Sequence, residues 1–511
     1  MFLAEWFGQE GPMVDRGSAP VVVGVDRGLS PSERWFWIID QISPSNCVAR
    51  VRVWGSVGAG EIERAWDVLA GEYPLLRVGV VDPDGGDPRF VTVGARIPVR
   101  RVEAEDPELW QREVDFEVVH PITVEHGVAR VVDVVGDAGH PGERHDLILT
   151  VSHTVMDGRS LLTVLRKLVE YLALERDSFC QAVAGAGVDG SRRAAVVGPG
   201  SEGSRAADAG SSVRSAGPEP GAGVPPGATG PGAARAAVPA SDDLIPAGAR
   251  GFWRYVYSNL ADQVVAMALR PRRLTGAVPL GLGERRTRAV YRVIGGADLG
   301  ELVAECRRAG VSVHGALGAA TARTIGESVR PGRGGVAGIG SPVDFRPLLR
   351  PRPDDDELGI YAPVLAGFVR FGPGISLWAM ARSVNRQLEK GIRRRRHLSA
   401  VAGMRFGTPR TVESGRRVVE LIDRRAPWNV SVTNVGRVDF PERVGALRLS
   451  DLTLAASNSC VSALTVAIVT AHDEMRISFC YVDGVLSRSE ADTFADRVVR
   501  ALTCRPAPAV V

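Results

Sequence analysis

The stretch that decides the fold is residues 147–160, which read LILTVSHTVMDGRS. Its first part is rich in apolar and β-branched residues, a pattern typical of a buried strand. Leucines then recur at helical spacing as far as Leu172, so a helix is predicted to follow a tight turn that Gly158 permits. The loop between strand and helix holds His153 and, four residues later, Asp157. A histidine at a strand end can face a cleft and titrate near neutral pH, as a general base must.

This segment resembles the His-x-x-x-Asp-Gly motif of the acyltransferase superfamily that includes chloramphenicol acetyltransferases, plant acyl-CoA-dependent acyltransferases and condensation domains of nonribosomal peptide synthetases. The stand-alone polyketide-associated acyltransferases of actinobacteria look most similar. Many members begin the motif with two histidines, the second of which is catalytic, and these positions are Ser152 and His153 here. The resemblance implies that His153 is the catalytic base and that Asp157 and Gly158 complete the motif. It leaves Ser152 as a candidate substrate contact.

Two later segments resemble other parts of the same family. Residues 339–347 contain Val-Asp-Phe-Arg, similar to a family segment whose arginine supports the active site. A buried Asp157 needs a partner, and Arg346 is the candidate because guanidinium can bind carboxylate with two bonds. The alternative is a surface turn capped by Arg346. Residues 428–437 resemble a family segment near the active-site tunnel. Three polar residues there are candidates for pocket hydrogen bonds or for a purely structural role: Ser431, Thr433 and Asn434.

A basic run closes a long helix predicted over residues 375–396, and it consists of Arg393, Arg394, Arg395 and Arg396. Such a run is ordinarily a solvated face. The alternative is a docking site for an acidic carrier protein or a phosphate-bearing acyl donor. The other histidines are expected to be surface, capping or packing residues. Those at 120, 126, 140 and 145 are placed in or near connections, and His314 in a helix, where a cleft-facing role is the alternative.

Composition restricts the class of protein. The chain has 511 residues, 45% of them hydrophobic, which is ample for a packed core and favours two or more domains. A net charge of +3 implies no general attraction to nucleic acids or membranes. The six cysteines are scattered, which argues against a metal site or a disulfide framework and favours the cytoplasm. The sequence contains neither a signal-peptide pattern nor an apolar span long enough to cross a membrane.

The resemblance implies an α/β fold, an α+β sandwich of two chloramphenicol-acetyltransferase-like lobes. Each lobe is a mixed sheet flanked by helices, and a tunnel runs between them. The predicted boundaries are an N-terminal extension (1–28), an N-terminal lobe (29–181), a linker (182–247) and a C-terminal lobe (248–505). The linker is rich in Gly, Ala, Pro and Ser and has few large apolar residues. It is therefore predicted to be disordered.

The implied activity is transfer of an acyl group from a CoA or carrier-protein thioester to a hydroxyl, or less favourably an amine, in natural-product or lipid biosynthesis. No permanently bound cofactor is expected, because the CoA or phosphopantetheine donor is a substrate. Asp157 would hold the loop rather than complete a Ser-His-Asp triad. The expected partners are the donor, a small acceptor and a carrier protein, with no nucleic acid, and the chain is expected to be a monomer. The alternative, kept open by Ser152, is a condensation-like protein that binds a carrier or catalyses cyclisation or dehydration without acyl transfer.

Overall fold

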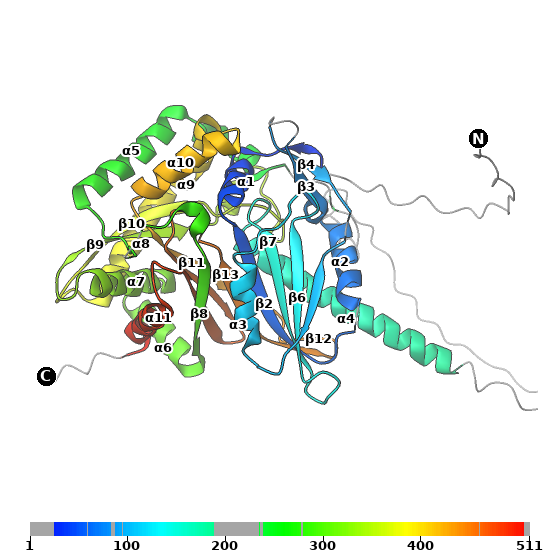
Figure 1. Cartoon of the computed structure of the whole chain (residues 1–511). Helices are drawn as coiled ribbons and strands as arrows, with labels where there is room; N and C mark the ends of the chain where they lie inside the picture. The colour runs from blue at the N-terminus through cyan, green and yellow to red at the C-terminus, as the bar shows by residue number, and fades with distance from the viewer. Residues whose placement is uncertain are drawn as a thin grey trace, which may run out of the picture.

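The computed structural model describes residues 25–58, 60–82, 87–94, 96–188, 235, 239–276, 279–458 and 460–504. In this part of the chain, two six-stranded mixed sheets and one three-stranded sheet are covered by helices (Figure 1). The predicted α/β class with two mixed sheets is confirmed, and neither six-stranded sheet closes into a barrel. Among the described residues, no helix is both long enough and apolar enough to cross a membrane.

The N-terminal lobe is built on one of the six-stranded sheets. Across the sheet the strands are β12 (Arg443–Val444), β13 (Leu447–Ala456), β2 (Asn46–Trp54), β7 (Arg144–Ser152), β6 (Ala129–Gly136) and β5 (Val99–Glu103). Strand β7 lies inside this sheet, and both of its faces are buried. Leu147, Leu149 and Val151 pack into one core and Ile148 into another. The apolar composition of the strand follows from this double burial.

Helices α2 (Glu61–Glu72) and α4 (Gly158–Val188) pack together on this lobe. Helix α3 (Leu109–Glu117) packs on the sheet face to which Ile148 points. A small sheet orders β1 (Arg27–Gly28), β4 (Arg89–Thr92) and β3 (Val78–Val81), the last after a 3-10 turn η1 (Pro74–Arg77). Helix α1 (Pro31–Ile42) begins at a capping box formed by Ser30 and Glu33. This cap fixes where α1 starts and therefore which side chains it presents to the end of β7.

The C-terminal lobe is built on the second six-stranded sheet. Its strands are, in order, β10 (Val364–Phe371), β9 (Gly335–Pro342), β11 (Val430–Arg437), β14 (Leu464–Ala471), β15 (Glu474–Val482) and β8 (Thr287–Gly295). Val466 and Ile468 of β14 belong to a core shared with the helices of this lobe, α6 (Gly296–Arg308), α7 (Val313–Val329), α8 (Leu377–Arg393) and α11 (Arg488–Thr503). Ala467 and Val469 belong to the core of the N-terminal lobe. The sheet therefore has helices on one face and the other lobe on the opposite face.

The structure corrects the predicted lobe boundaries. Strands β12 and β13 come from the predicted C-terminal lobe, yet β13 pairs with β2 in the N-terminal sheet. Helix α4 continues to Val188, past the predicted boundary at residue 181. Residues 239–249 fall partly in the predicted linker, but they form η3 (Ser241–Leu244) and η4 (Ala247–Ala249). The buried Leu244 and Ile245 anchor them.

The remainder of the predicted linker, residues 189–234 and 236–238, lies outside the described residues. Most of the predicted N-terminal extension does too, since description begins at Val25 and β1 follows at once. Three helices form the upper edge of the C-terminal lobe in Figure 1: α5 (Phe252–Leu269), α9 (Arg396–Gly407) and α10 (Val412–Arg425). The helix predicted over 375–396 is interrupted, because Arg395 adopts a left-handed conformation between α8 and α9.

Candidate active site

The end of β7 fixes the position of His153. The strand runs through Ser152, which is paired with Asn46 of β2, and the His153 backbone N–H then donates to the carbonyl of Ser45 at 2.8 Å. The imidazole stacks on Phe36 of α1, with ring centroids 4.0 Å apart and an interplanar angle of 18°. The backbone is therefore held by the residue directly before β2, and the ring is held by α1.

Burial sets the charge of this imidazole. Desolvation lowers the pKa of His153 below its usual value, and the Asp157 carboxylate and the backbone carbonyls of His153 and Met156 oppose that shift only in part. The Nδ1 atom is buried and forms no hydrogen bond of normal geometry with the described residues. A neutral imidazole at pH 7 follows, which is the form that can accept a proton.

Asp157 joins the two lobes and does not bond to the imidazole in the way a triad aspartate does. Its carboxylate is 4% exposed and accepts hydrogen bonds from the backbone N–H groups of Ser160 and Tyr361, both at 2.9 Å. The first bond caps the start of α4, and the second reaches a loop of the C-terminal lobe. The Asp157 N–H also donates to the Gly359 carbonyl at 3.0 Å. These bonds therefore anchor the C-terminal end of the loop that carries His153.

Gly158 is the first residue of α4 and does not adopt the left-handed conformation. A β-carbon built there would lie 3.4 Å from Leu454 of β13, within ordinary contact distance. The prediction that the turn depends on the backbone freedom of Gly158 is therefore wrong. The turn is held by the hydrogen bonds of Asp157 instead.

Arg346 lies beside Asp157, as the sequence predicted, but with a different geometry. Its guanidinium is fully buried, and its Nη2 atom is 3.6 Å from Asp157 Oδ1, too long for a two-bond clamp. Nη2 instead donates to Ser160 Oγ at 2.8 Å, and the guanidinium carbon lies 4.0 Å from the centre of the Tyr361 ring. The alternative of a surface turn cap is excluded by this burial.

Sequence reasoning missed Ser160, Gly359 and Tyr361. The Ser160 hydroxyl accepts from Arg346 and from the Gly359 N–H at 3.2 Å, and it donates to the Gly359 carbonyl at 3.0 Å. Ser160 follows the motif directly and sits in the first turn of α4, which was a usable signal. Gly359 and Tyr361 bond to Asp157 and Ser160 through backbone groups, which leave no signature in a sequence, although the Tyr361 ring also lies against Arg346.

Ser152 points into the core of its own turn. It is 0% exposed, and its hydroxyl donates to Thr154 Oγ1 at 3.0 Å and accepts from the Thr154 N–H at 3.3 Å. These bonds stabilise the start of the loop, on either side of His153. A contact between Ser152 and substrate remains a prediction.

Two of the candidate polar residues of β11, Ser431 and Thr433, lie on the sheet face turned towards the N-terminal lobe, whereas Asn434 is in phase with Val430 and Val432 on the other face. Val430 and Val432 face the helix-covered core, so Ser431 and Thr433, one residue out of phase, face the other way. Asn434 Oδ1 accepts from the Gly436 N–H at 2.9 Å, where the pairing with β14 becomes irregular. Their participation in a substrate pocket remains a prediction.

Two other histidines are structural. His145 lies inside β7, 0% exposed, with Nδ1 2.8 Å from Asp133 Oδ1 and Nε2 2.9 Å from Glu143 Oε1. It is the second residue of β7, next to a connection as predicted, but it is a buried residue and not a surface or capping one. His314 of α7 is packed against Ser341, with 3.0 Å between Nε2 and Oγ, and burial lowers its pKa to about 4.

Of the basic run, Arg393, Arg394 and Arg395 are exposed, and Arg396 is half-buried and pairs with Asp262 of α5. Arg396 therefore lies against α5, and the other three arginines directly precede it in the chain. What they bind is not set by these contacts and remains a prediction.

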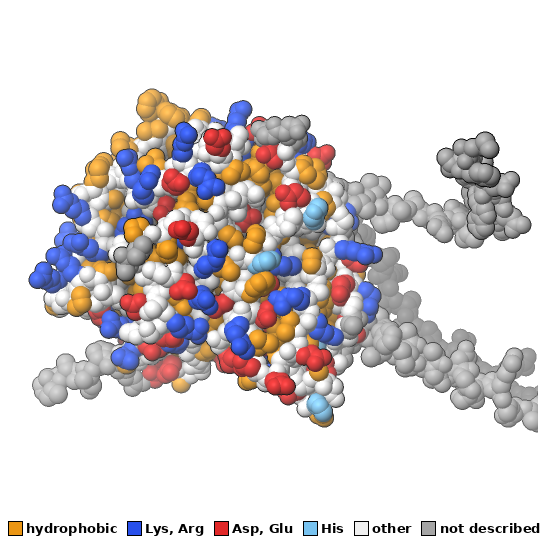
Figure 2. Space-filling model, viewed as in Figure 1, with side chains coloured by type: hydrophobic (Ala, Val, Ile, Leu, Met, Phe, Trp, Pro, Cys, Tyr) orange, Lys and Arg blue, Asp and Glu red, His pale blue; other side chains and the backbone are white. Residues whose placement is uncertain are grey.

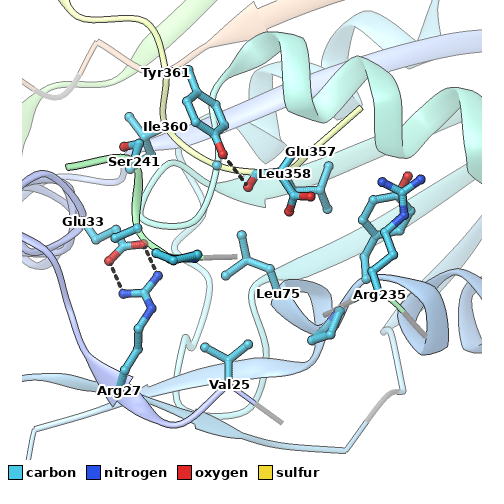
Figure 3. Close-up of a pocket in the computed structure, with 15 residues that line it drawn as sticks. Val25, Arg27, Glu33, Leu75, Arg235, Ser241, Glu357, Leu358, Ile360 and Tyr361 are labelled. Atoms are coloured by element: carbon cyan, nitrogen blue, oxygen red, sulfur yellow. Dashed lines mark hydrogen bonds and ion pairs between the residues drawn. The ribbon is translucent and has the colours of Figure 1, made fainter. Parts of the chain in front are cut away.

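Two cavities can be placed relative to the site. One, of about 30 Å³, lies where the loop containing Glu357 and Tyr361 meets η1, the start of α1 and the segment before η3 (Figure 3). It has room for one or two waters and is too small for a substrate. The other, of about 1170 Å³, lies among α6, α7, α8 and α11. His153 lines neither of them, so the predicted tunnel between the lobes remains a prediction.

Comparisons with known proteins agree with this architecture. Residues 297–487 match the family model described as phthiocerol/phthiodiolone dimycocerosyl transferase C-terminus. The fold is similar to that of polyketide synthase associated protein 5 from Mycobacterium tuberculosis, at 14% identity and a TM-score of 0.59, covering 94% of this chain and 98% of that one. No curated protein sequence matches the chain.

Condensation-type domains share the fold. The first condensation domain of the CDA synthetase aligns at 17% identity with a TM-score of 0.58, covering 94% of this chain and 95% of that one. A cyclization-docking bidomain from Sorangium cellulosum aligns at 14% identity with a TM-score of 0.59, covering 97% and 88%. The resemblance predicted from the His153 segment is thereby confirmed. The chain has the two-lobed fold of the condensation and chloramphenicol acetyltransferase-like acyltransferase superfamily, and residues 297–487 of its C-terminal lobe match the phthiocerol/phthiodiolone dimycocerosyl transferase C-terminus model.

Proposed function

We propose that the protein transfers an acyl group from a CoA or carrier-protein thioester to a hydroxyl acceptor, with His153 as the general base. The observation that carries the proposal is a half-buried imidazole at the end of β7, held against Phe36, whose lowered pKa keeps it neutral at pH 7. The match of residues 297–487 to a family named for a dimycocerosyl transferase supports acyl transfer as the reaction.

In the proposed reaction, the neutral His153 ring takes the proton of the acceptor hydroxyl as its oxygen attacks the thioester carbonyl carbon. A carbon–oxygen bond forms, and the carbon–sulfur bond then breaks. The departing thiolate takes the proton back from the imidazolium, so the base is regenerated and no acyl-enzyme is formed. General-base catalysis of this type contributes on the order of 10²–10⁴-fold in rate.

Asp157 and Arg346 take a positioning role in this proposal. Both oxygens of the Asp157 carboxylate accept backbone hydrogen bonds, so the group is committed to holding the loop. The Arg346 guanidinium lies 3.6 Å from the Asp157 carboxylate and compensates its negative charge within the buried cluster. Proximity of donor and acceptor to His153 then depends on the rigidity of this loop. Ser431, Thr433 and Asn434 are proposed to contribute polar contacts from β11.

The second candidate is a condensation-like protein that binds an acyl carrier, or cyclises or dehydrates its substrate, without acyl transfer. It is favoured by the fold shared with a cyclization-docking bidomain and by Ser152 in place of the first motif histidine. The burial of Ser152 weakens the second argument, because its hydroxyl bonds within the turn and faces away from solvent.

The test is product formation with a panel of acyl-CoA and acyl-carrier donors and simple alcohol and amine acceptors, followed by mass spectrometry. His153→Ala is expected to lose at least a hundredfold in rate. His126→Ala, at an exposed histidine of the same lobe, serves as the matched control and should act like wild type. Carrier binding without product from any donor would favour the second candidate. Equal turnover by wild type and His153→Ala would refute the assigned base.

A further inference from the structure

Helix α5 carries a long apolar stripe that no other described part of the chain covers. Five side chains spaced four and three residues apart lie along one side of the helix, and they are 50–78% exposed: Trp253, Tyr257, Leu260, Val264 and Met267. The stripe runs for about 21 Å at the rise of an α-helix. Isolated exposed apolar residues are ordinary, whereas a continuous row of this length marks an interaction surface.

The stripe is an outer face of a firmly attached helix. Tyr255, on the opposite side of α5, packs so closely on α9 that a β-carbon at Gly403 would lie 1.9 Å from its ring. Phe252 meets Phe406 of α9 edge to face, with centroids 5.1 Å apart. Because the inner side is fixed in this way, α5 cannot turn its exposed side onto α9 without losing these contacts.

Positive charge is concentrated next to the stripe. Residues 250–273 and 390–410 together carry 12 Arg and Lys and a single Asp, while the whole chain has a net charge of only +3. Several of these arginines are exposed: Arg270, Arg272, Arg393, Arg394, Arg395, Arg405 and Arg410. Figure 2 shows hydrophobic side chains along the upper edge of the molecule, where Figure 1 places α5, with Lys and Arg gathered beside them. The net charge of +3 implied no general attraction to membranes, but that value is a sum over the whole chain and does not reveal the local concentration of arginines around α5.

We propose that α5 and the arginines beside it form a docking surface for an anionic membrane. Trp and Tyr are suited to the boundary between lipid and water, and a helix that lies in that boundary buries an apolar stripe while its arginines meet anionic headgroups. The proposal is separate from the acyl transfer proposed above, because it involves neither His153 nor the loop that holds it.

Two other occupants fit the surface less well. A second copy of the chain would bring one strongly positive surface against another, which opposes association. A carrier protein offers the right charge, but peptide and helix partners of apolar stripes are received in grooves. Here α5 lies at the outer edge of the lobe (Figure 1), and the side chains of the stripe are 50–78% exposed. An exposed apolar helix is suited to a deformable lipid surface.

The test is cosedimentation of the full chain with vesicles of phosphatidylcholine, with and without phosphatidylglycerol. Wild type is expected to bind the anionic vesicles, with binding that falls as salt rises from about 0.1 M to about 1 M. The triple variant Trp253→Ser/Tyr257→Ser/Met267→Ser should lose at least about tenfold in partitioning. Arg393→Gln/Arg394→Gln/Arg395→Gln should lose about a hundredfold.

The matched controls lie on α3 of the other lobe. Phe116→Ser removes an aromatic side chain that is 46% exposed, and Arg112→Gln neutralises an exposed arginine, so both should bind like wild type. Circular dichroism and the thermal midpoint verify that each variant is folded. Absence of wild-type binding to the anionic vesicles would overturn the proposal. So would a wild-type dimer that the stripe variant converts to monomer without any vesicle binding, or equal vesicle binding by all variants.

Discussion

Replacing Asp157 by alanine is predicted to destabilise the protein through a defined set of lost contacts. The carboxylate caps α4 through the Ser160 N–H, and loss of a cap costs about 0.5–2 kcal/mol. The Tyr361 N–H would remain buried without an acceptor, at a further cost of about 1–3 kcal/mol. The buried Arg346 would lose its nearby countercharge. The combined loss is about 3–5 kcal/mol, similar to that for breaking a buried ion pair.

Thermal unfolding measures this loss. At about 2.1 cal/mol/K of unfolding entropy per residue, a chain of 511 residues shifts its Tm by about 1 °C per kcal/mol, so Asp157→Ala should lower Tm by about 3–5 °C. The control is Asp344→Ala, because that carboxylate is 3.4 Å from the same Arg346 but 29% exposed, and its loss should cost less than about 1 kcal/mol. A Tm for Asp157→Ala equal to that of wild type would refute the idea that this carboxylate fastens the loop.

Three further predictions concern the surroundings of the site. Ser160→Ala removes the hydroxyl between Arg346 and Gly359 and should lower the free energy of unfolding by about 1–3 kcal/mol, with Ser160→Thr retaining most of it; equal melting of all three proteins would contradict this. Ser152→His should destabilise by about 1–3 kcal/mol because the site is fully buried, and an unchanged or raised Tm would show that the position has room for the histidine. Burial raises the pKa of Glu357 from 4.5 to about 7, so the folded protein keeps a proton that the unfolded chain loses and stability falls as pH rises between these values. The Tm of Glu357→Gln should therefore decline less than that of wild type between those two pH values, and parallel curves would argue against a protonated Glu357.

The sequence predicted the parts of the site that have a local signature. Strand β7 was recognisable because both of its faces are apolar, and the His153 loop because histidine, aspartate and glycine follow a strand at fixed spacing. Arg346 was identified through the need of a buried carboxylate for a cation. The geometry of Arg346 was not predictable, because its Nη2 atom donates to the Ser160 hydroxyl and not to the Asp157 carboxylate.

The features that could not be predicted from the sequence are mainly contacts between residues far apart in the chain. The bond from the Tyr361 N–H to Asp157 uses a backbone group that every residue except proline has. The pairing of β13 with β2 joins segments about four hundred residues apart, and strand propensity does not identify the partner. Residues 239–249 resemble the adjoining low-complexity segment in composition, yet two buried apolar side chains, Leu244 and Ile245, are enough to anchor them.

The pH dependence of kcat/KM for acyl transfer tests the central claim most directly, because it reports the ionisation of the free enzyme's base. Since burial lowers the pKa of His153, its ring stays neutral at pH values where an ordinary histidine is protonated. The rate should therefore be level around pH 7 and fall only below about pH 6.5, the usual pKa of histidine. The residual activity of His153→Ala should lack this acid limb. A limb centred above pH 7, or one that persists unchanged in His153→Ala, would contradict the assignment of His153 as the base.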